Sequence, residues 1–203
     1  MAEIPRVILI GGAPLSGKTS LARALARRFD LACISSDDLS TAIRAITDAD
    51  THPALHLHDA DGQYRETYPS HSPEQLIAHA LAYHRAAWPA VQAVISAHAN
   101  WERPCVLEGW GVLPAYVAGL ELEAIGALFL VPDEALFERR CRENPSFYQG
   151  ADDEEALIRS FAHRSALFSR MLEASATEHG LPVLRGTATT SLEEVLEQSL
   201  SLL

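Results

Sequence analysis

Residues 7–19 of the chain read VILIGGAPLSGKT. The first four of these residues are apolar and lead into a glycine pair, which is typical of a short strand that is buried on both faces. Residues 12–19 fit the pattern G-x-x-x-x-G-K-[ST], and apolar residues recur at helical spacing over residues 18–29. A strand, a glycine-rich loop and a helix in this order predict a loop that binds phosphate, which we call the phosphate loop.

The residue types of this loop suit an anionic ligand. Glycine lets the backbone approach phosphate oxygens closely, and successive amides at a helix N-terminus point at the anion. Lys18 is the only lysine of the chain beside 15 arginines, and its compact ammonium group fits where a forked guanidinium would not. The hydroxyl of Thr19 can bind Mg²⁺. The expected nucleotide-binding residues are Gly12, Ala13, Pro14, Leu15, Ser16, Gly17, Lys18, Thr19 and Ser20.

The rest of the chain alternates short apolar segments with helical segments. Further strands are expected at 31–34, 105–108, 125–131 and 181–184, and further helices at about 38–46, 72–99, 133–142 and 152–178 and after Ser191. Ser72 with Gln75, and Ser191 with Glu194, have the spacing of capping boxes at the starts of two of these helices. This order indicates βαβ units and an α/β fold with a five-stranded, mainly parallel sheet. Because no repeat or linker divides the sequence, we expect one domain over residues 1–203.

Composition and charge limit the possible partners. The chain has 203 residues, of which 48% are hydrophobic, and a formal net charge of −11. The acidic balance argues against non-specific binding to nucleic acid or to an anionic membrane, because both need a basic surface. The three cysteines form no CxxC pair, and neither a signal peptide nor a membrane-spanning apolar run is recognisable, so we expect a cytoplasmic protein with reduced thiols.

Two carboxylates stand at the ends of expected strands, where parallel sheets bind ligands. Asp37 follows the second strand and could hold or deprotonate an attacking hydroxyl group, while Asp38 would start the next helix; alternatively, either residue is only a helix cap. Glu108 ends the third strand and is placed to hold a Mg²⁺-bound water or an acceptor group. Gly109 after it would allow a ligand to approach closely.

Arginines precede and follow a loop at 143–151, which we expect to act as a lid. Phosphoryl transfer needs additional positive charge around the γ-phosphate, and a mobile lid with arginines can supply it and exclude water. Arg139 and Arg140 are the preferred candidates, and Arg159 and Arg164 are weaker ones. The alternative is that these arginines merely suit the C-terminus of a helix.

The segment from His52 to Asp61 is rich in histidine and aspartate, which are metal-ligand types. A polar loop on the substrate side explains this composition equally well. We therefore expect no dedicated metal site there.

Taken together, these motifs resemble the P-loop small-molecule kinases of the nucleoside-monophosphate-kinase-like group, and within it the 2-phosphoglycerate kinase-like proteins. The resemblance is carried by residues 12–19, by 34–44 (ISSDDLSTAIR) and by 107–114 (LEGWGVLP). It implies a parallel sheet with helices on both faces, ATP with Mg²⁺, and transfer of phosphate to a small acceptor that the region 47–100 would contact. Gly111 stands where the family has a histidine, so 2-phosphoglycerate itself is not the expected acceptor.

The resemblance also implies roles for single residues. Lys18, Asp37, Arg139 and Arg140 would be catalytic, and Thr19 and Glu108 would hold Mg²⁺, Glu108 through a water. The expected acceptor-binding residues are Asp37, Arg44, Glu108, Gly109 and Trp110.

Three functions remain open at this stage. The first is an ATP-dependent kinase for the hydroxyl group of a small molecule, acting as a monomer or a homodimer. The second is a nucleotide-binding module that hydrolyses ATP slowly and acts through a protein partner. The third is a nucleoside monophosphate kinase, which would need more arginines than the three found in region 40–100. A Ras-like GTPase is unlike this sequence, because the guanine-reading motif requires a second lysine.

Overall fold

A computed structural model describes residues 4–56, 65, 68, 70–101, 103–120, 125–187 and 189–203. Its five strands form one parallel sheet in the order β2-β3-β1-β4-β5. The strands are β1 (Val7–Gly12), β2 (Ala32–Ser35), β3 (Cys105–Gly109), β4 (Ile125–Leu130) and β5 (Val183–Leu184). This arrangement confirms the predicted fold class.

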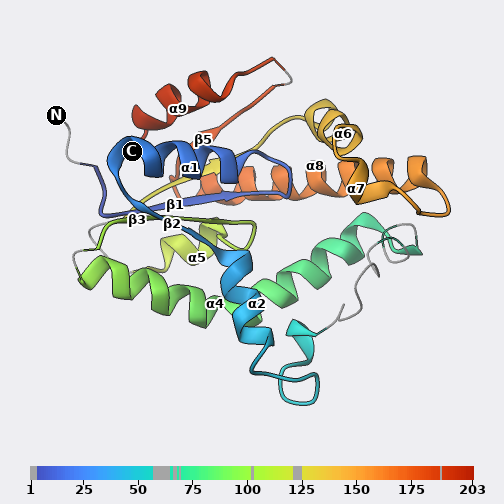
Figure 1. The fold of residues 1–203 in the computed structure, drawn as a ribbon, viewed down its shortest axis with the longest axis horizontal. Helices are drawn as coiled ribbons and strands as arrows, with labels where there is room; N and C mark the ends of the chain where they lie inside the picture. The colour runs from blue at the N-terminus through green and yellow to red at the C-terminus, as the bar shows by residue number, and fades with distance from the viewer. Residues whose placement is uncertain are drawn as a thin grey trace.

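Helices cover both faces of the sheet (Figure 1). The helices are α1 (Lys18–Phe29), α2 (Ser36–Arg44), α4 (Pro73–Asn100), α5 (Pro114–Ala118), α6 (Glu134–Arg142), α7 (Pro145–Tyr148), α8 (Glu154–Glu178) and α9 (Leu192–Leu200), with a 3₁₀ turn η1 (Pro53–Leu55). Helices α1 and α9 pack on one face, and α4, α5 and α8 pack on the other. Most of the long helices thus pack on the two apolar faces of a single sheet.

The central strand β1 explains why its sequence is apolar without interruption. Val7 and Leu9 point to the side of α4 and α8, whereas Ile8 and Ile10 point to α1. All four side chains are fully buried, because a parallel strand in the middle of the sheet is covered on both faces. Each such side chain contributes about 1.5–3 kcal/mol of hydrophobic stabilisation.

The helix starts follow the local sequence, with one correction. Ser72 and Ser191 form the predicted capping boxes of α4 and α9. Helix α2, however, begins at Ser36 rather than near residue 38, because the side chain of Ser35 already accepts a hydrogen bond from the Asp37 amide. Asp37 and Asp38 therefore both lie in the first helical turn and neither is the cap.

Two short helices were not predicted. Helix α5 follows β3, and α7 lies within the segment expected to be a loop at 143–151. Each has proline at its first turn, which supplies a preformed helical φ angle without losing a needed amide. The expected lid thus contains one ordered turn, whose Phe147 ring lies 4.6 Å from the Phe161 ring of α8.

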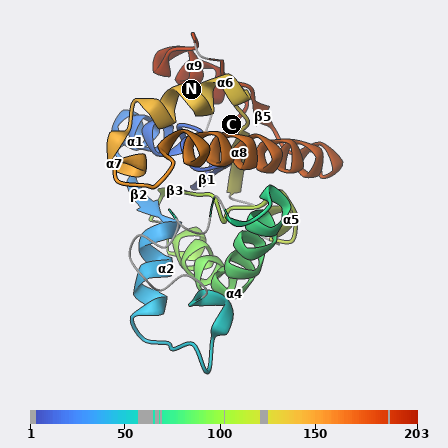
Figure 2. The same ribbon diagram turned by 90° about the vertical axis from the view of Figure 1, so that its right-hand side faces the viewer.

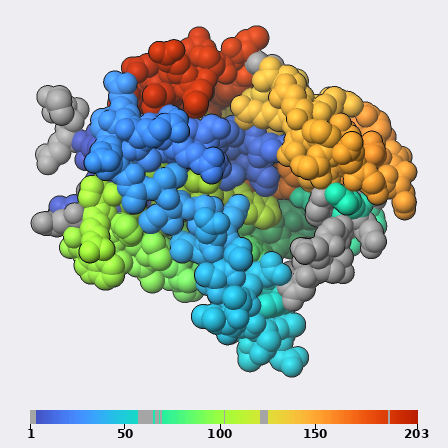
Figure 3. Space-filling view, viewed as in Figure 1, coloured from blue at the N-terminus to red at the C-terminus, as the bar shows by residue number. Residues whose placement is uncertain are grey.

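Helices α2 and α6 pack against different helices, α2 against α4 and α6 against α8. Figure 2 shows α6 and α7 near α1 on one side of the sheet and α2 beside α4 on the other. In the space-filling view of Figure 3, the segment from α2 to η1 protrudes from the body. Among the described residues, no helix combines the length and the apolar character that crossing a bilayer requires.

Candidate functional site

The phosphate loop connects β1 to α1 through a tight backbone path. Gly17 has a φ angle of 100°, in the left-handed region that favours glycine, and Leu15 has a φ angle of 64°. A Cβ on Gly12 would lie 2.5 Å from Ser16 Oγ, so the loop closes on itself too tightly for a larger residue. The Lys18 side chain is buried and lies back over the loop, with Nζ 3.5 Å from the carbonyl oxygen of Ala13.

The first turn of α1 lacks the cap that the other long helices have. Helices α2, α4, α6, α8 and α9 each begin with a serine or aspartate side chain that accepts an amide hydrogen bond. At α1 the preceding residue is Gly17, and within the described residues no side chain caps the helix. The free amides and the positive end of the helix dipole therefore face the loop, where they suit a phosphate group.

A carboxylate of β3 lies against the start of α1. The hydroxyl of Thr19 donates a hydrogen bond of 2.9 Å to Oε1 of Glu108, whose side chain is only 4% exposed. Burial raises the pKa of Glu108, while Lys18 and the Thr19 hydrogen bond oppose this rise. The second oxygen, Oε2, is buried without a hydrogen-bond partner among the described residues. A hydroxyl and a carboxylate with a spare oxygen are ligand types that Mg²⁺ accepts, directly or through water.

Lys18 lies between two carboxylates. Its pKa is lowered by burial, and the charges of Glu108 and Asp37 counteract this shift. Acidic groups or a bound phosphate beside a buried lysine favour its charged form.

Asp37 follows β2 in the chain and lies in the first turn of α2. Trp110, which follows β3, lies close enough to the carboxylate to oppose the rise in its pKa that burial causes. Asp37 as a whole is exposed to solvent, but the protein around its carboxyl group raises the pKa of that group by desolvation. The positive charge of Lys18 opposes this rise. Asp37 therefore stands within electrostatic reach of the lysine that would hold the transferring phosphate.

Two glycines after β3 make room for protein groups. A Cβ on Gly109 would lie 1.6 Å from Ser36 Oγ, so this glycine admits the start of α2. Gly109 therefore has a packing role, and its expected role in the close approach of a ligand stays a prediction. A Cβ on Gly111 would lie 2.7 Å from Nδ1 of His84, a residue of α4. An imidazole thus occupies the place beside Gly111, although it comes from a different segment than the resemblance implies.

The two preferred arginines of α6 take different positions. Arg140 reaches the phosphate loop, where NH1 donates a hydrogen bond of 2.6 Å to the Leu15 carbonyl and lies 3.1 Å from the position of a Cβ on Gly17. Arg139 is exposed, and its Nε lies 3.5 Å from Glu143. Of the pair, the structure brings only Arg140 to the loop.

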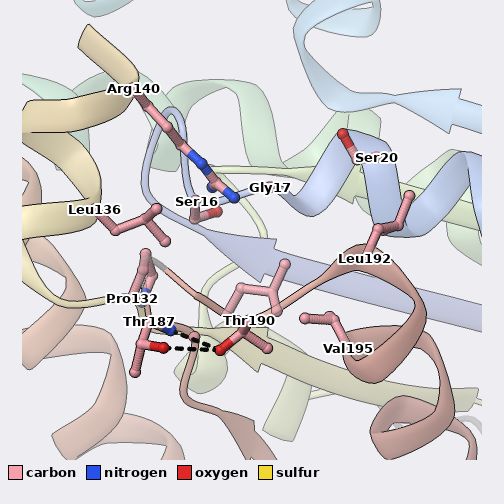
Figure 4. Close-up of a pocket in the computed structure, with 12 residues that line it drawn as sticks. Ser16, Gly17, Ser20, Pro132, Leu136, Arg140, Thr187, Thr190, Leu192 and Val195 are labelled. Carbon is pink, nitrogen blue, oxygen red and sulfur yellow. Dashed lines mark hydrogen bonds between the residues drawn. The ribbon is translucent and has the colours of Figure 1, made fainter. Parts of the chain in front are cut away.

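A cavity of about 150 Å³ adjoins the phosphate loop and was not predicted. In Figure 4, Arg140 reaches over Gly17 on one wall, and Thr187 and Thr190 are joined by a 3.0 Å hydrogen bond on the other. The lining residues are Ser16, Gly17, Ser20, Leu130, Pro132, Leu136, Arg140, Gly186, Thr187, Thr190, Leu192 and Val195. Several of them follow β4 and β5, so the strand-end rule that indicated Asp37 could have found them.

The remaining candidates lie away from the loop or outside the described residues. Arg44 ends α2 and is half-buried, and Arg159 pairs with Glu155 on the surface at 3.5 Å. His52 is exposed, and His56 Nε2 lies 3.0 Å from the Thr47 hydroxyl. The other residues of metal-ligand type in this segment, residues 58, 59 and 61, lie outside the described residues, and the described part holds no cluster of metal ligands.

The fold has counterparts among solved structures. A Chloroflexus aurantiacus protein, provisionally described as a kinase, is 15% identical, with 99% of this chain and 100% of that one covered and a TM-score of 0.53. Shikimate kinase from Acinetobacter baumannii, solved in complex with shikimate, is 12% identical, with 98% of this chain and 92% of that one covered and a TM-score of 0.53. No family model and no curated protein matches the sequence. At these identities the likeness establishes the fold, and the function must be argued from the site.

Proposed function

We propose that the protein is an ATP-dependent phosphotransferase, which moves the γ-phosphoryl group of Mg-ATP to a hydroxyl group of a small molecule. The observation that carries this proposal is the position of Asp37. Its carboxylate lies near Trp110 and within electrostatic reach of Lys18, whereas the other carboxylate of the site, Glu108, accepts a hydrogen bond from Thr19. The fold shared with shikimate kinase supports the same class of reaction.

The nucleotide would lie across the uncapped start of α1. The free amides of the first turn and Lys18 would bind the β- and γ-phosphates, and Arg140 would contact the phosphates from the side of α6. The neighbouring cavity, which has apolar walls from Leu136 and Val195, would receive the base and the ribose of the nucleotide. Bound Mg²⁺, held through Thr19 and Glu108, would neutralise part of the phosphate charge.

Asp37 would handle the proton of the reaction. The acceptor hydroxyl donates a hydrogen bond to this carboxylate, its oxygen forms the new bond to the γ-phosphorus, and the bond from phosphorus to the leaving oxygen of ADP breaks. The hydroxyl proton passes to Asp37. The raised pKa of Asp37 suits this role, because a more basic carboxylate accepts the proton more readily.

The experiment that tests the proposal measures ADP release by the purified protein over a panel of small hydroxy compounds. Asp37→Asn is expected to lower acceptor-stimulated turnover by about 10²–10⁴-fold while leaving Mg-ATP binding intact, since general-base catalysis contributes on this order. The matched control is Asp38→Asn, which changes the exposed neighbour in the same helical turn and should behave like the wild type.

A different result would favour the nucleotide-binding module. If no compound raised ADP release above the basal rate, and Asp37→Asn retained that rate, the phosphotransferase proposal would be wrong.

A further inference from the structure

Arg164, in the middle of α8, is a buried cation that the proposed chemistry does not use. Its side chain is 1% exposed, and NH2 donates a hydrogen bond to the hydroxyl of Tyr68. Nε and NH1 are buried and have no hydrogen-bond partner among the described residues. Burying a guanidinium group in this way is unfavourable unless an opposite charge compensates it.

The immediate neighbours of Arg164 are aromatic rather than acidic. Its guanidinium carbon lies 4.9 Å from the ring centre of Phe161, 5.2 Å from that of Tyr68 and 5.5 Å from that of Trp110. Aromatic faces attract a cation, but they do not accept the hydrogen bonds of its planar edge. Burial raises the pKa of Tyr68, so its hydroxyl group stays neutral and brings no negative charge. The guanidinium therefore keeps free N–H groups, which suit an oxyanion in a forked geometry.

Arg164 packs against the Trp110 ring and is not among the residues that line the nucleotide cavity. Burial raises the pKa of the Asp37 carboxyl group, and Lys18 and Trp110 oppose this rise, so Trp110 lies near Asp37 as well. The charge of Arg164 also reaches Lys18, because it adds to the lowering of the Lys18 pKa that burial causes. The cavity beside the phosphate loop is served by Arg140 instead. His84 belongs to the same cluster, since its ring lies 4.3 Å from the Trp110 ring and its buried Nε2 has no partner among the described residues.

We propose that Arg164 binds an anionic group of the phosphoryl acceptor itself, so that the acceptor is a small hydroxy compound with a carboxylate or phosphate group. This inference rests on the proposed function and names its substrate class. An acceptor whose hydroxyl group meets Asp37 places its anionic group against Arg164, with the Trp110 indole between the two contacts.

The first test is a calorimetric titration with inorganic phosphate of protein already saturated with Mg²⁺ and a non-hydrolysable ATP analogue. The analogue fills the phosphate loop, so added phosphate reports on a separate site. The wild type is expected to bind phosphate, and Arg164→Gln is expected to bind it at least tenfold more weakly. Arg170→Gln, which changes an exposed arginine of the same helix, should match the wild type.

The possible outcomes separate this inference from the function on which it rests. Failure of the wild type to bind the analogue would refute the proposed function. Normal binding of the analogue without phosphate binding, or equal phosphate affinity in Arg164→Gln, would overturn the role of Arg164 alone. A loss of analogue affinity in Arg164→Gln, with no phosphate site in the wild type, would assign the arginine to the nucleotide.

A second variant distinguishes the loss of an anion-binding group from a general loss of stability. Arg164→Met removes the buried charge and keeps an apolar side chain among the rings. Phosphate should raise the unfolding temperature of the analogue-saturated wild type and of Arg170→Met, but not that of Arg164→Met. An equal phosphate-induced rise in all three proteins would overturn the proposal, whatever their unfolding temperatures without phosphate.

Matched acceptor pairs then distinguish the two kinds of anion. ADP release is measured with a hydroxy carboxylate against its neutral amide, and with a sugar phosphate against the free sugar. Stimulation by at least one anionic member, with loss in Arg164→Gln, is the expected result. Stimulation only by the neutral members would overturn the proposal.

Discussion

At the scale of single residues, the site gathers positive charge inside an acidic protein. Lys18 and Arg164 are almost completely buried, and Arg140 is half-buried, although the chain has a formal net charge of −11. Buried cations without full compensation are unfavourable in a folded protein and are commonest at functional sites. We infer that an anionic ligand bound at these cations compensates their buried charge and so stabilises the folded protein.

His84 gives a prediction about pH. Burial, together with the charges of Arg164 and Lys18, lowers the pKa of this histidine from 6.5 to about 3. Below about pH 6.5 the unfolded chain takes up a proton that the folded protein does not, so stability falls as the pH decreases through this range. Between pH 7 and pH 5 the loss from this group amounts to about 2 kcal/mol.

The measurement is urea-induced unfolding at pH 7 and pH 5. His84→Gln should lose about 2 kcal/mol less than the wild type over this interval, because it lacks the titrating group. His179→Gln, which changes an exposed histidine, should keep the wild-type dependence. Parallel losses in the wild type and His84→Gln would contradict the buried, neutral state of His84.

The two arginines of α6 give a second prediction. Arg140→Gln should weaken Mg-ATP binding by about tenfold or more, because a charge-assisted contact to a phosphate is worth about 1.5–3 kcal/mol. Arg139→Gln should bind Mg-ATP within about twofold of the wild type, since this side chain lies on the exposed side of α6. Equilibrium dialysis with labelled nucleotide measures both. Equal losses of Mg-ATP affinity in the two variants would show that both arginines of α6 act on the nucleotide. That result would contradict the assignment of Arg140 alone to the phosphate loop.

At the scale of elements, the start of α2 is positioned by its packing against the end of β3. Ser36 is buried against Gly109, and Asp37 is the next residue along the helix. Any group added at Gly109 therefore pushes the helix start that carries Asp37.

The corresponding prediction is that Gly109→Ala destabilises the protein by about 1–3 kcal/mol, the usual effect of overpacking. Gly186→Ala is the matched control, because an added Cβ there would meet nothing within 4 Å. Chemical denaturation of the two variants and the wild type provides the comparison. Wild-type stability in Gly109→Ala would mean that α2 can shift away at little cost, and Asp37 would then be less firmly held than we describe.

Local signals in the sequence were sufficient for most elements. The phosphate loop, the parallel strands and the capping boxes at Ser72 and Ser191 each depend on neighbouring residues, so the sequence predicts them directly. The start of α2 was misplaced because four consecutive polar residues, 35–38, could each cap it, and Ser35 does so. The short helices α5 and α7 escaped prediction because neither is long enough to show a helical repeat of apolar residues.

The site was only partly predictable for a different reason. Asp37 and Glu108 follow from the rule that strand ends of a parallel sheet meet at one edge. The choice of Arg140 over Arg139 depends on which side of α6 faces the loop, and the burial of Arg164 depends on rings from three separate segments. Contacts of this kind are set by tertiary packing, which a single sequence does not contain.

At the scale of the whole molecule, one edge of the sheet carries every group in the proposal. The phosphate loop follows β1, Asp37 follows β2, Trp110 follows β3, and the cavity is closed by the segments after β4 and β5. Arg164 belongs to α8, the helix that follows the expected lid in the chain, and lies at this edge against the Trp110 ring. The proposals therefore place the nucleotide and a small anionic acceptor at this one edge of the sheet.

The central claim is that the uncapped start of α1 and Lys18 hold a magnesium nucleotide, and a calorimetric titration with Mg-ATP tests it most directly. We predict binding of one nucleotide per chain in the wild type and at least tenfold weaker binding in Lys18→Ala, with both proteins folded by circular dichroism. Absence of binding in the wild type, or equal affinity in Lys18→Ala, would contradict the account.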